Sequence, residues 1–544
     1  MTVNIFYRKI PPSSVPYLFV AGPEDYSLFS WREFISLPTL RHETYQKFLQ
    51  DYSQTLNAFW QKNQDHPCFS YLPFSLRNTW QSRFYYGMES YARLSLLREG
   101  DVYFTSPHWF LWAVKNFPHE ASARDIRRAR ADALKCRAKN FLKRLKGIRF
   151  ALSQYSPQVK VPTGIRHAFF SIWTPAGQKK WQSSASDPFY DNIPSAMNNA
   201  LIIYHLEGAQ YCKYPDCDGR TVLRDTSLLS LFDWASLIKA VISFRVNIPM
   251  TCNAPLGAVE DDVASSIMNQ MVLGLISYYA ALNIAKVNQS ANFITLFEGN
   301  CWEQGVLRAA AINTRNVTSV QHTAFSLGML KMSAHDYIRR PSRIITTGPV
   351  VTELLNTHMG YDKKVIETGC RLRNDAGNSS TPSERGKKIL ILLQGAPHEN
   401  FMLSRLEKVH LPLEILVRDH PSQPLGGYIG LDRSKGSMAD DLKDAALVIY
   451  NGTTAVFDAL LAGIPCIYFS CGDEGRNDPL FNTGSAIKRD CLDVADLPRI
   501  VDEVINLPDC EYSMAIDKMH AYIQGYFKSP TPGDVENVIR ILKL

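Results

Sequence analysis

Short apolar runs alternate with helix-like stretches along most of this chain, starting near residue 166. The first set of runs reads HAFFSIW, ALIIYHL, VISFRV, ANFITLFEG, VTSVQHT, RIITTG and VIETG. A second set follows a polar stretch, Arg373–Lys388, and reads KKILILLQG, LEILVRDHP, DLKDAALVIY and IPCIYFS, with a helical pattern near Val494–Leu507. Strands separated by helices favour parallel pairing with right-handed crossovers. The pattern therefore predicts an α/β protein made of two doubly wound, Rossmann-like halves that face each other across a cleft.

The polar stretch combines Gly, Ser, Pro and charge without periodicity, which is typical of an interdomain linker. We therefore expect an N-terminal half over residues 1–375 and a C-terminal half over residues 385–544. Within the first half, residues 1–115 mix the strand-like pieces NIFY, YLFVAG and DVYFTS with aromatic-rich helical stretches, and no function is assigned to them. Residues 116–160 are predicted to form a basic helical insertion.

Size and composition agree with a multidomain globular protein. The chain has 544 residues, 45% of them hydrophobic, which is too long for one hydrophobic core. No apolar run reaches the roughly 20 residues that span a bilayer, and the longest, Met271–Ala285, is better interpreted as a buried helix. The N-terminus lacks a basic segment followed by an apolar core, so a cytoplasmic location is expected. Eleven cysteines are scattered without metal-site or disulfide spacing, and they imply no metal.

The net charge of +7 is unevenly distributed. Between Arg124 and Arg149 the chain carries eleven Lys or Arg residues against two Asp residues. Helical spacing sets Ile126, Ala129, Ala133, Phe141, Leu145 and Ile148 near one side and leaves a broad cationic face. This face is either a solvated surface or a contact with anionic lipid headgroups, each basic residue adding roughly 1 kcal/mol near an acidic bilayer. Nucleic-acid binding is disfavoured because no reader motif accompanies the charge.

A histidine turn follows the strand-like run LEILV. Ligands of an open α/β sheet bind at the carboxyl ends of its strands, and His420 stands at such an end. Pro421 restricts the local backbone, so that the imidazole can point toward a phosphate and offset charge on a departing nucleotide. Arg418 is a further candidate for phosphate binding, although it can also face solvent. A plain surface turn remains the alternative for His420.

About thirty residues later, the segment NGTT follows the run ALVIY and is expected to open a helix. Gly452 permits a tight backbone path, and the hydroxyls of Thr453 and Thr454 can bind phosphate beside free helix N–H groups. Helix capping explains either Thr equally well. Asp458 is placed to bind a ribose hydroxyl or to favour the helix dipole.

Acidic residues end an apolar run in the middle of the chain. Glu298 directly precedes a glycine at the expected sheet edge, which suits a general base or a nucleophile, with Glu303 as its support. His322 closes the next run and is placed to orient the acid or to touch substrate. Further upstream, Asp187 and Asp191 are reserve carboxylates that turn formation also explains. A structural N-cap is the alternative for Glu298.

These segments resemble a known family. The runs FEGNCWEQGVLRAA, SVQHTAFSLGML and RIITTGPVVTELL resemble GT-B glycosyltransferases of bacterial surface polysaccharide biosynthesis. The His-Pro turn and YNGTTAVFDALLAGIPCIYF look like motifs of transferases that use CMP-activated sialic acid or Kdo. The resemblance covers roughly residues 166–469. It departs from the family in having Asn-Gly-Thr-Thr where Ser-Ser or Thr-Ser is more usual, and Thr rather than Gly after His322.

The resemblance implies transfer of a sugar, Kdo or another ulosonic acid, from a CMP donor to a lipid-linked glycan such as O-antigen, capsule or lipopolysaccharide. It implies no metal and no cofactor beyond the nucleotide-sugar substrate. The C-terminal half would bind the donor and the N-terminal half the acceptor, at the cytoplasmic face of the inner membrane. The alternatives are a UDP-, GDP- or other NDP-sugar donor, a CDP-polyol donor, a noncatalytic scaffold of the assembly complex, and a nonhydrolysing sugar-nucleotide epimerase.

Overall fold

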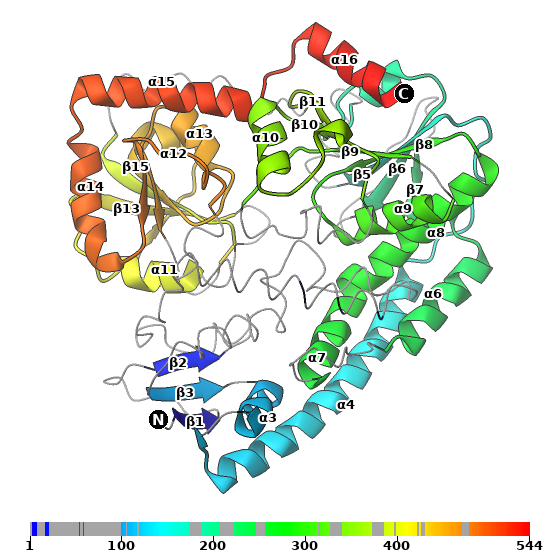
Figure 1. Cartoon of the computed structure of the whole chain (residues 1–544), viewed down its shortest axis with the longest axis horizontal. Coiled ribbons are helices and arrows are strands. Elements are labelled where there is room, and N and C mark those ends of the chain that lie inside the picture. The colour runs from blue at the N-terminus through cyan, green and yellow to red at the C-terminus, as the bar shows by residue number, and fades with distance from the viewer. Residues whose placement is uncertain are drawn as a thin grey trace.

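The computed structural model describes residues 3–7, 17–20, 54, 58, 62, 100–104, 106–116, 119–173, 186–206, 222–245, 256–313, 316–326, 340–372, 386–395, 399–420, 424–425, 430–469 and 478–543. Within these residues three parallel sheets are present (Figure 1). Two of them are large and correspond to the predicted halves. The third is small and is formed by the N-terminal segment.

The sheet of the N-terminal half has seven parallel strands in the order β11-β10-β9-β8-β5-β6-β7. The strands are β5 (His167–Trp173), β6 (Ala200–Leu206), β7 (Val222–Arg224), β8 (Asn292–Leu296), β9 (Val317–Val320), β10 (Arg343–Thr346) and β11 (Ile366–Thr368). Strand order reverses between β5 and β8, so right-handed crossovers place helices on both faces. The associated helices are α6 (Leu231–Ser243), α7 (Leu256–Ser266), η8 (Ile267–Met271), α8 (Val272–Val287), α9 (Cys301–Ile312) and α10 (Pro349–Thr357), with short η6 (Ile193–Ala196), η7 (Asp225–Leu228) and η10 (Lys363–Val365).

The sheet of the C-terminal half has six parallel strands in the order β14-β13-β12-β15-β16-β17. The strands are β12 (Lys388–Leu392), β13 (Glu414–Arg418), β14 (Asp432–Arg433), β15 (Ala445–Tyr450), β16 (Cys466–Phe469) and β17 (Lys488–Cys491). Its helices are α11 (Glu399–Leu406), α12 (Met438–Asp444), α13 (Val456–Leu461), η11 (Val494–Asp496) and α14 (Leu497–Ile505). The order reverses between β12 and β15. The predicted fold class, two doubly wound parallel α/β halves, is confirmed.

The last two helices connect the halves. Helix α15 (Asp509–Tyr526) contacts both α13 and α10, and α16 (Pro532–Lys543) packs on the N-terminal half (Figure 1). Arg343 of β10 donates to the Ile541 carbonyl at 2.8 Å. The last strand of the first sheet ends at Thr368 and the first strand of the second begins at Lys388, whereas the end of the chain returns to the first half. Most of the predicted linker lies outside the described residues.

The N-terminal segment forms a four-stranded parallel sheet in the order β2-β3-β1-β4. Its strands are β1 (Val3–Tyr7), β2 (Tyr17–Val20), β3 (Gly100–Phe104) and β4 (His119–Glu120). They are followed by α3 (Pro107–Asn116) and by the 31-residue helix α4 (Ala123–Ser153), which runs from this sheet to the seven-stranded half (Figure 1). The three strand-like pieces of residues 1–115 and the basic helix are therefore confirmed.

One predicted strand is wrong. VISFRV was expected to be a strand, but residues 241–243 end helix α6. Ser230 and Asp233 form a reciprocal capping box that starts this helix, and Trp234, Leu237 and Val241 give it a buried face. The apolar run 271–285 is a buried helix, as predicted, because α8 lies against α9. Among the described residues, no helix combines the length and apolar character needed to cross a bilayer.

Candidate functional site

The loop between β8 and α9 is held by one buried carboxylate. Glu303 has no exposed surface, and its Oε2 accepts the backbone N–H groups of Glu298 at 2.9 Å and Gly299 at 2.8 Å. Its Oε1 accepts from the side-chain amide of Asn300 at 3.0 Å, and this amide also donates to Glu298 Oε2 at 2.9 Å. Glu303 therefore holds the backbone of this loop in position.

Glu298 is the acidic group that this loop presents. Its Oε1 lies 2.9 Å from Nε2 of His322, which follows β9 on the neighbouring strand. Both side chains are more than nine-tenths buried. The structure thus places His322 beside the acid that it was expected to orient, and the pair has the contact that a carboxylate and its orienting imidazole require.

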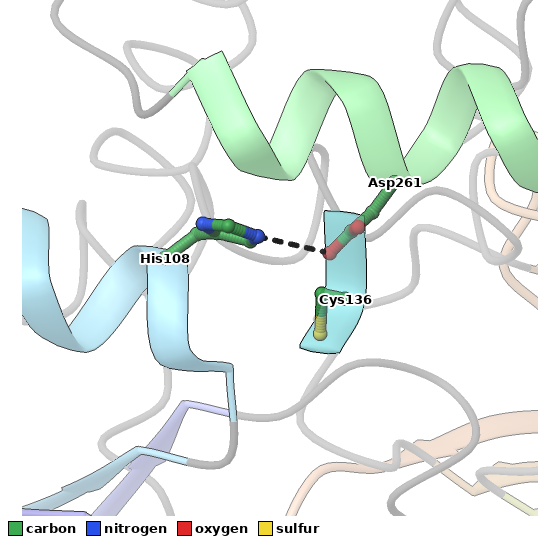
Figure 2. A group of neighbouring side chains, drawn as sticks. All are labelled: His108, Cys136 and Asp261. Carbon is green, nitrogen blue, oxygen red and sulfur yellow. Dashed lines mark ion pairs between the residues drawn. The ribbon is translucent and has the colours of Figure 1, made fainter. Parts of the chain in front are cut away.

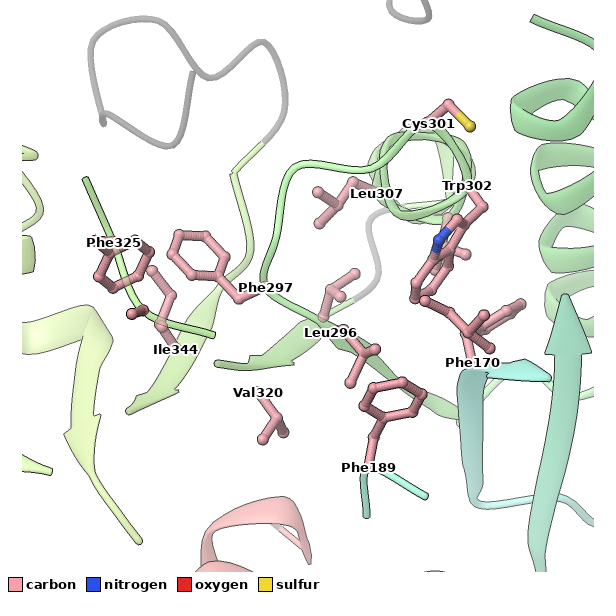
Figure 3. Packing of buried hydrophobic residues seen from close by; sticks show 14 of the residues in the cluster. Phe170, Phe189, Leu296, Phe297, Cys301, Trp302, Leu307, Val320, Phe325 and Ile344 are labelled. Carbon is pink, nitrogen blue, oxygen red and sulfur yellow. The ribbon is translucent and has the colours of Figure 1, made fainter. Parts of the chain in front are cut away.

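Aromatic side chains pack around Phe297, the residue directly before Glu298. Phe297 packs edge-to-face on Phe325 and on Tyr361, at ring separations of 6.2 Å and 5.8 Å. The buried side chains of Trp302 and Phe170 form a second group below α9, separated from Phe297 by Leu296 and Leu307 (Figure 3). Such packing fixes the backbone on both sides of Glu298, so the acid is carried by a rigid part of the fold.

The reserve carboxylates Asp187 and Asp191 shape a turn beside the pair. Asp187 is buried and accepts the N–H groups of Phe189 at 2.7 Å and Tyr190 at 2.8 Å, while burial raises its pKa. Asp191 bridges back to Asp187 and has a left-handed φ of 51°. The turn places the Phe189 ring edge-to-face against the His322 ring, with the ring centroids 4.7 Å apart. Asp187 forms the turn through its carboxylate and Asp191 through its backbone, and the catalytic role of Asp191 stays a prediction.

The C-terminal half repeats the carboxylate-held loop. After β12, Glu399 accepts the backbone N–H groups of Gln394 at 2.9 Å and Gly395 at 2.8 Å. Gly395 and Gly299 both have positive φ values, 84° and 74°, which suit glycine. This loop lies at the reversal of its sheet, as the Glu298 loop does, and such reversals are where ligands of open α/β sheets bind. The sequence carries a signal for this loop that was not used, because EGNCWE and QGAPHE share the same spacing of glycine and glutamate.

The histidine turn follows β13 as expected. His420 is half-buried, and burial lowers the pKa of its imidazole. Arg418 is engaged elsewhere: its guanidinium contacts Asp441 at 2.5 Å and donates to the Gly436 carbonyl at 3.0 Å. These contacts give Arg418 a structural partner, and its phosphate-binding role stays a prediction. Pro421 lies outside the described residues.

The segment after β15 is anchored at its first residue. The buried amide of Asn451 donates to the Phe469 carbonyl at 2.7 Å and to the Tyr468 hydroxyl at 3.2 Å. Gly452 follows with a φ of 117°. Thr453 is buried and its hydroxyl accepts from the Ala455 N–H at 3.3 Å, whereas Thr454 is exposed.

The helix after this segment begins later than expected, at Val456, and it is only six residues long. Asp458 lies within it, and burial raises the pKa of this carboxyl while the charge of Arg371 lowers it. The partner that the structure places near Asp458 is therefore Arg371, a residue of the N-terminal half. The predicted ribose contact of Asp458 stays a prediction.

The loops that carry His322 and Thr453 meet on one helix. The Tyr526 hydroxyl of α15 accepts the backbone N–H of Phe325 at 2.7 Å, three residues after His322. The ring of Tyr526 packs on Phe457 at 5.0 Å, four residues after Thr453. Tyr526 therefore connects the carboxyl-edge loops of the two sheets.

Two doubly wound parallel halves, connected in this way, form the α/β arrangement that the sequence predicted. No family model matches the chain, and no curated protein matches its sequence. The fold is similar to UDP-GlcNAc 2-epimerase from Methanocaldococcus jannaschii in complex with UDP-GlcNAc and UDP, at 11% identity and a TM-score of 0.40, over 69% of this chain and 99% of that chain. It is also similar to Anabaena HepE in complex with UDP, at 10% identity and a TM-score of 0.39, over 70% and 99% of the two chains. A wall teichoic acid polymerase, TagF, is similar at 11% identity and a TM-score of 0.34, over 76% and 97%.

Proposed function

We propose that this protein is a glycosyltransferase that moves a sugar from a nucleotide donor to a hydroxyl of a lipid-linked surface glycan. The observation that carries the proposal is the contact between Glu298 and His322 at the carboxyl edge of the first sheet, where ligands of such sheets bind. Motif resemblance supports a CMP-activated ulosonic acid such as Kdo as the donor.

Glu298 is the general base in this proposal. It takes the proton of the acceptor hydroxyl while the hydroxyl oxygen attacks the anomeric carbon, and the bond between that carbon and the donor phosphate breaks. His322 holds the carboxylate in place through Nε2. If transfer retains configuration, Glu298 instead attacks the anomeric carbon and a covalent glycosyl-enzyme forms first.

In this proposal the C-terminal half binds the donor phosphate. His420 stands after β13 and Thr453 and Thr454 stand after β15, two strands that both border β12. The imidazole and the hydroxyls are donors suited to a phosphate oxygen. The loop of Gln394 and Gly395 ends β12 between them and is a third part of this edge.

The exposed face of α4 supports a lipid-linked acceptor. Leu134, Phe141, Leu145 and Leu152 are exposed and recur at spacings that place them along one line of the helix. Phe141 and Leu145 were expected on the packing side, but that side is formed by residues such as Ala129, Gly147 and Ala151. An apolar line flanked by Lys and Arg is typical of a helix lying on an anionic bilayer.

The test is incubation of the pure protein with CMP-, UDP- and GDP-sugars and with CDP-polyols, with and without acceptor glycan, followed by mass spectrometry. Transfer from a CMP-sugar that requires acceptor supports the proposal. Conversion of a UDP-sugar to its epimer without acceptor would assign the protein to the epimerases. Normal glycan synthesis in cells that carry both Glu298→Gln and His420→Gln would assign a scaffold role.

A further inference from the structure

Three side chains of different metal-binding chemistry meet outside the proposed transferase site. His108 of α3, Cys136 of α4 and Asp261 of α7 each offer one ligand atom, and these atoms all lie within 4.8 Å of one another (Figure 2). His108 and Asp261 are buried, and Cys136 is partly buried. The imidazole Nε2 lies 3.7 Å from the Asp261 Oδ2 atom.

Neighbouring groups orient two of the three ligands. The side-chain amide of Asn140, one turn after Cys136, donates to the Asp261 Oδ1 atom at 2.7 Å. This bond directs the other carboxylate oxygen toward His108. Gly257, one turn before Asp261, lies so close to the His108 ring that a Cβ atom there would overlap it. In metal sites, neighbouring groups hold the ligands in one orientation, often through hydrogen bonds. Here Asn140 fixes the carboxylate by a bond to its other oxygen, and Gly257 limits rotation of the imidazole ring.

The ligand set matches one class of ion. Thiolate, imidazole and carboxylate are all ligands of Zn²⁺, with bonds of about 2.0–2.3 Å and tetrahedral geometry. Such bonds place ligand atoms about 3.3–3.7 Å apart. For a nitrogen and an oxygen ligand the expected separation is about 3.3–3.5 Å, so the observed 3.7 Å from imidazole to carboxylate is slightly long. The separations from the Cys136 sulfur, which are at most 4.8 Å, need to shorten by at most about 1.3 Å.

We propose that His108, Cys136 and Asp261 bind one Zn²⁺ ion, with a water molecule as the fourth ligand. The ion would join α3, which follows the small N-terminal sheet, to α4 and to α7 of the seven-stranded half. Binding releases the thiol proton of Cys136, because thiolate is the form that ligates. The site is separate from Glu298 and His420, so its role is to hold the N-terminal sheet on the rest of the protein.

The experiment uses the full-length protein, stripped with a chelator and titrated with Zn²⁺ and with Co²⁺. We expect one equivalent of tightly held zinc by elemental analysis and a thiolate-to-cobalt charge-transfer band in the Co²⁺ form. Cys136→Ser should abolish the band, and His108→Ala and Asp261→Asn should each weaken zinc binding about tenfold or more. Cys510→Ser, which removes an exposed thiol on α15, is the matched control and should bind as the wild type does.

The melting temperature of the wild type should rise with zinc and fall with chelator, since an ion that binds only the folded state stabilises it. The same ion should leave the melting temperature of Cys136→Ser unchanged. Wild-type protein without a charge-transfer band, or with a band that persists in Cys136→Ser, would overturn the proposal. The wild-type spectrum decides the matter even if a variant fails to fold.

Discussion

Glu298 and His322 form a contact of 2.9 Å between loops that follow two neighbouring strands. Each residue comes at the end of an apolar run, and their contact exists because β8 and β9 are adjacent and parallel. The pair joins the loops at the carboxyl ends of these two strands. Its buried surroundings and the loop below it lead to the first two predictions.

Replacing Glu298 with Gln should lower the transfer rate about 10²- to 10⁴-fold, the range attributed to a general base. The amide keeps the shape of the side chain, so the fold should be retained. Rates measured with saturating donor, beside circular dichroism spectra, test this expectation. If Glu298 is instead the nucleophile of a retaining reaction, mass spectrometry of the trapped wild-type enzyme should show a sugar bound to Glu298. A variant as active as wild type would remove Glu298 from the mechanism.

Glu303→Gln should destabilise the fold. The buried carboxylate accepts two backbone N–H groups, and hydrogen bonds to a charged group contribute about 2–3 kcal/mol. Denaturant unfolding should show a loss of this order. Glu399→Gln is the matched change in the other half and should show a similar loss. Unchanged stability in both variants would mean that the loops do not depend on their carboxylates.

Donor affinity should rise as pH falls toward 6, and His420 is the group responsible. When no donor is bound, burial lowers the pKa of the imidazole below its usual value of about 6.5, so the imidazole is neutral at pH 7. A bound phosphate favours the protonated form and raises the pKa, so binding takes up a proton and gains strength at lower pH. Calorimetry with a CMP-sugar, whose phosphodiester keeps its charge in this range, measures the effect. His420→Gln should bind more weakly with an affinity that no longer depends on pH, and a wild-type slope retained in this variant would assign the proton to another group.

Substitutions of Thr453 and Thr454 should differ in their effect on stability while both weaken donor binding. Thr454→Val removes an exposed hydroxyl and should raise the KM for donor about tenfold with unchanged melting temperature. Thr453→Val also removes the acceptor for the Ala455 N–H, so it should cost about 1 kcal/mol of stability as well. Steady-state kinetics and thermal unfolding of both variants provide the comparison. An unchanged KM in both would exclude the hydroxyls from donor binding.

The exposed face of α4 should bind anionic vesicles. Phe141→Ser combined with Leu145→Ser should lower cosedimentation with phosphatidylglycerol vesicles, because apolar insertion is lost. Wild-type binding should also fall with salt and be weak on neutral vesicles. Phe232→Ser on α6 is the control, since Phe232 is exposed but has no comparable run of basic neighbours. Equal binding by all variants would place the membrane contact elsewhere or exclude it.

The local pattern of apolar residues was sufficient to predict the two large parallel sheets. Runs such as KILIL and AALVIY are apolar on both faces, as strands covered by helices on both sides must be, and the alternation with helices specified parallel pairing. The wrong strand, VISFRV, is apolar enough for either structure, and the capping box of Ser230 and Asp233 upstream of it starts a helix that includes its first residues. The polar strand β17, KRDC, has no such pattern and was not predicted.

In the candidate site, too, some features follow from the sequence and others only from the tertiary structure. The sequence by itself placed Glu298, His322, His420 and Thr453 at strand ends, because the carboxyl end of a strand is defined by where an apolar run stops. Only the tertiary structure decided that Glu298 meets His322, that Arg418 is held by Asp441, and that His108, Cys136 and Asp261 converge. Contacts between residues distant in sequence depend on strand order and helix packing, and the local chemistry of a segment does not contain that information.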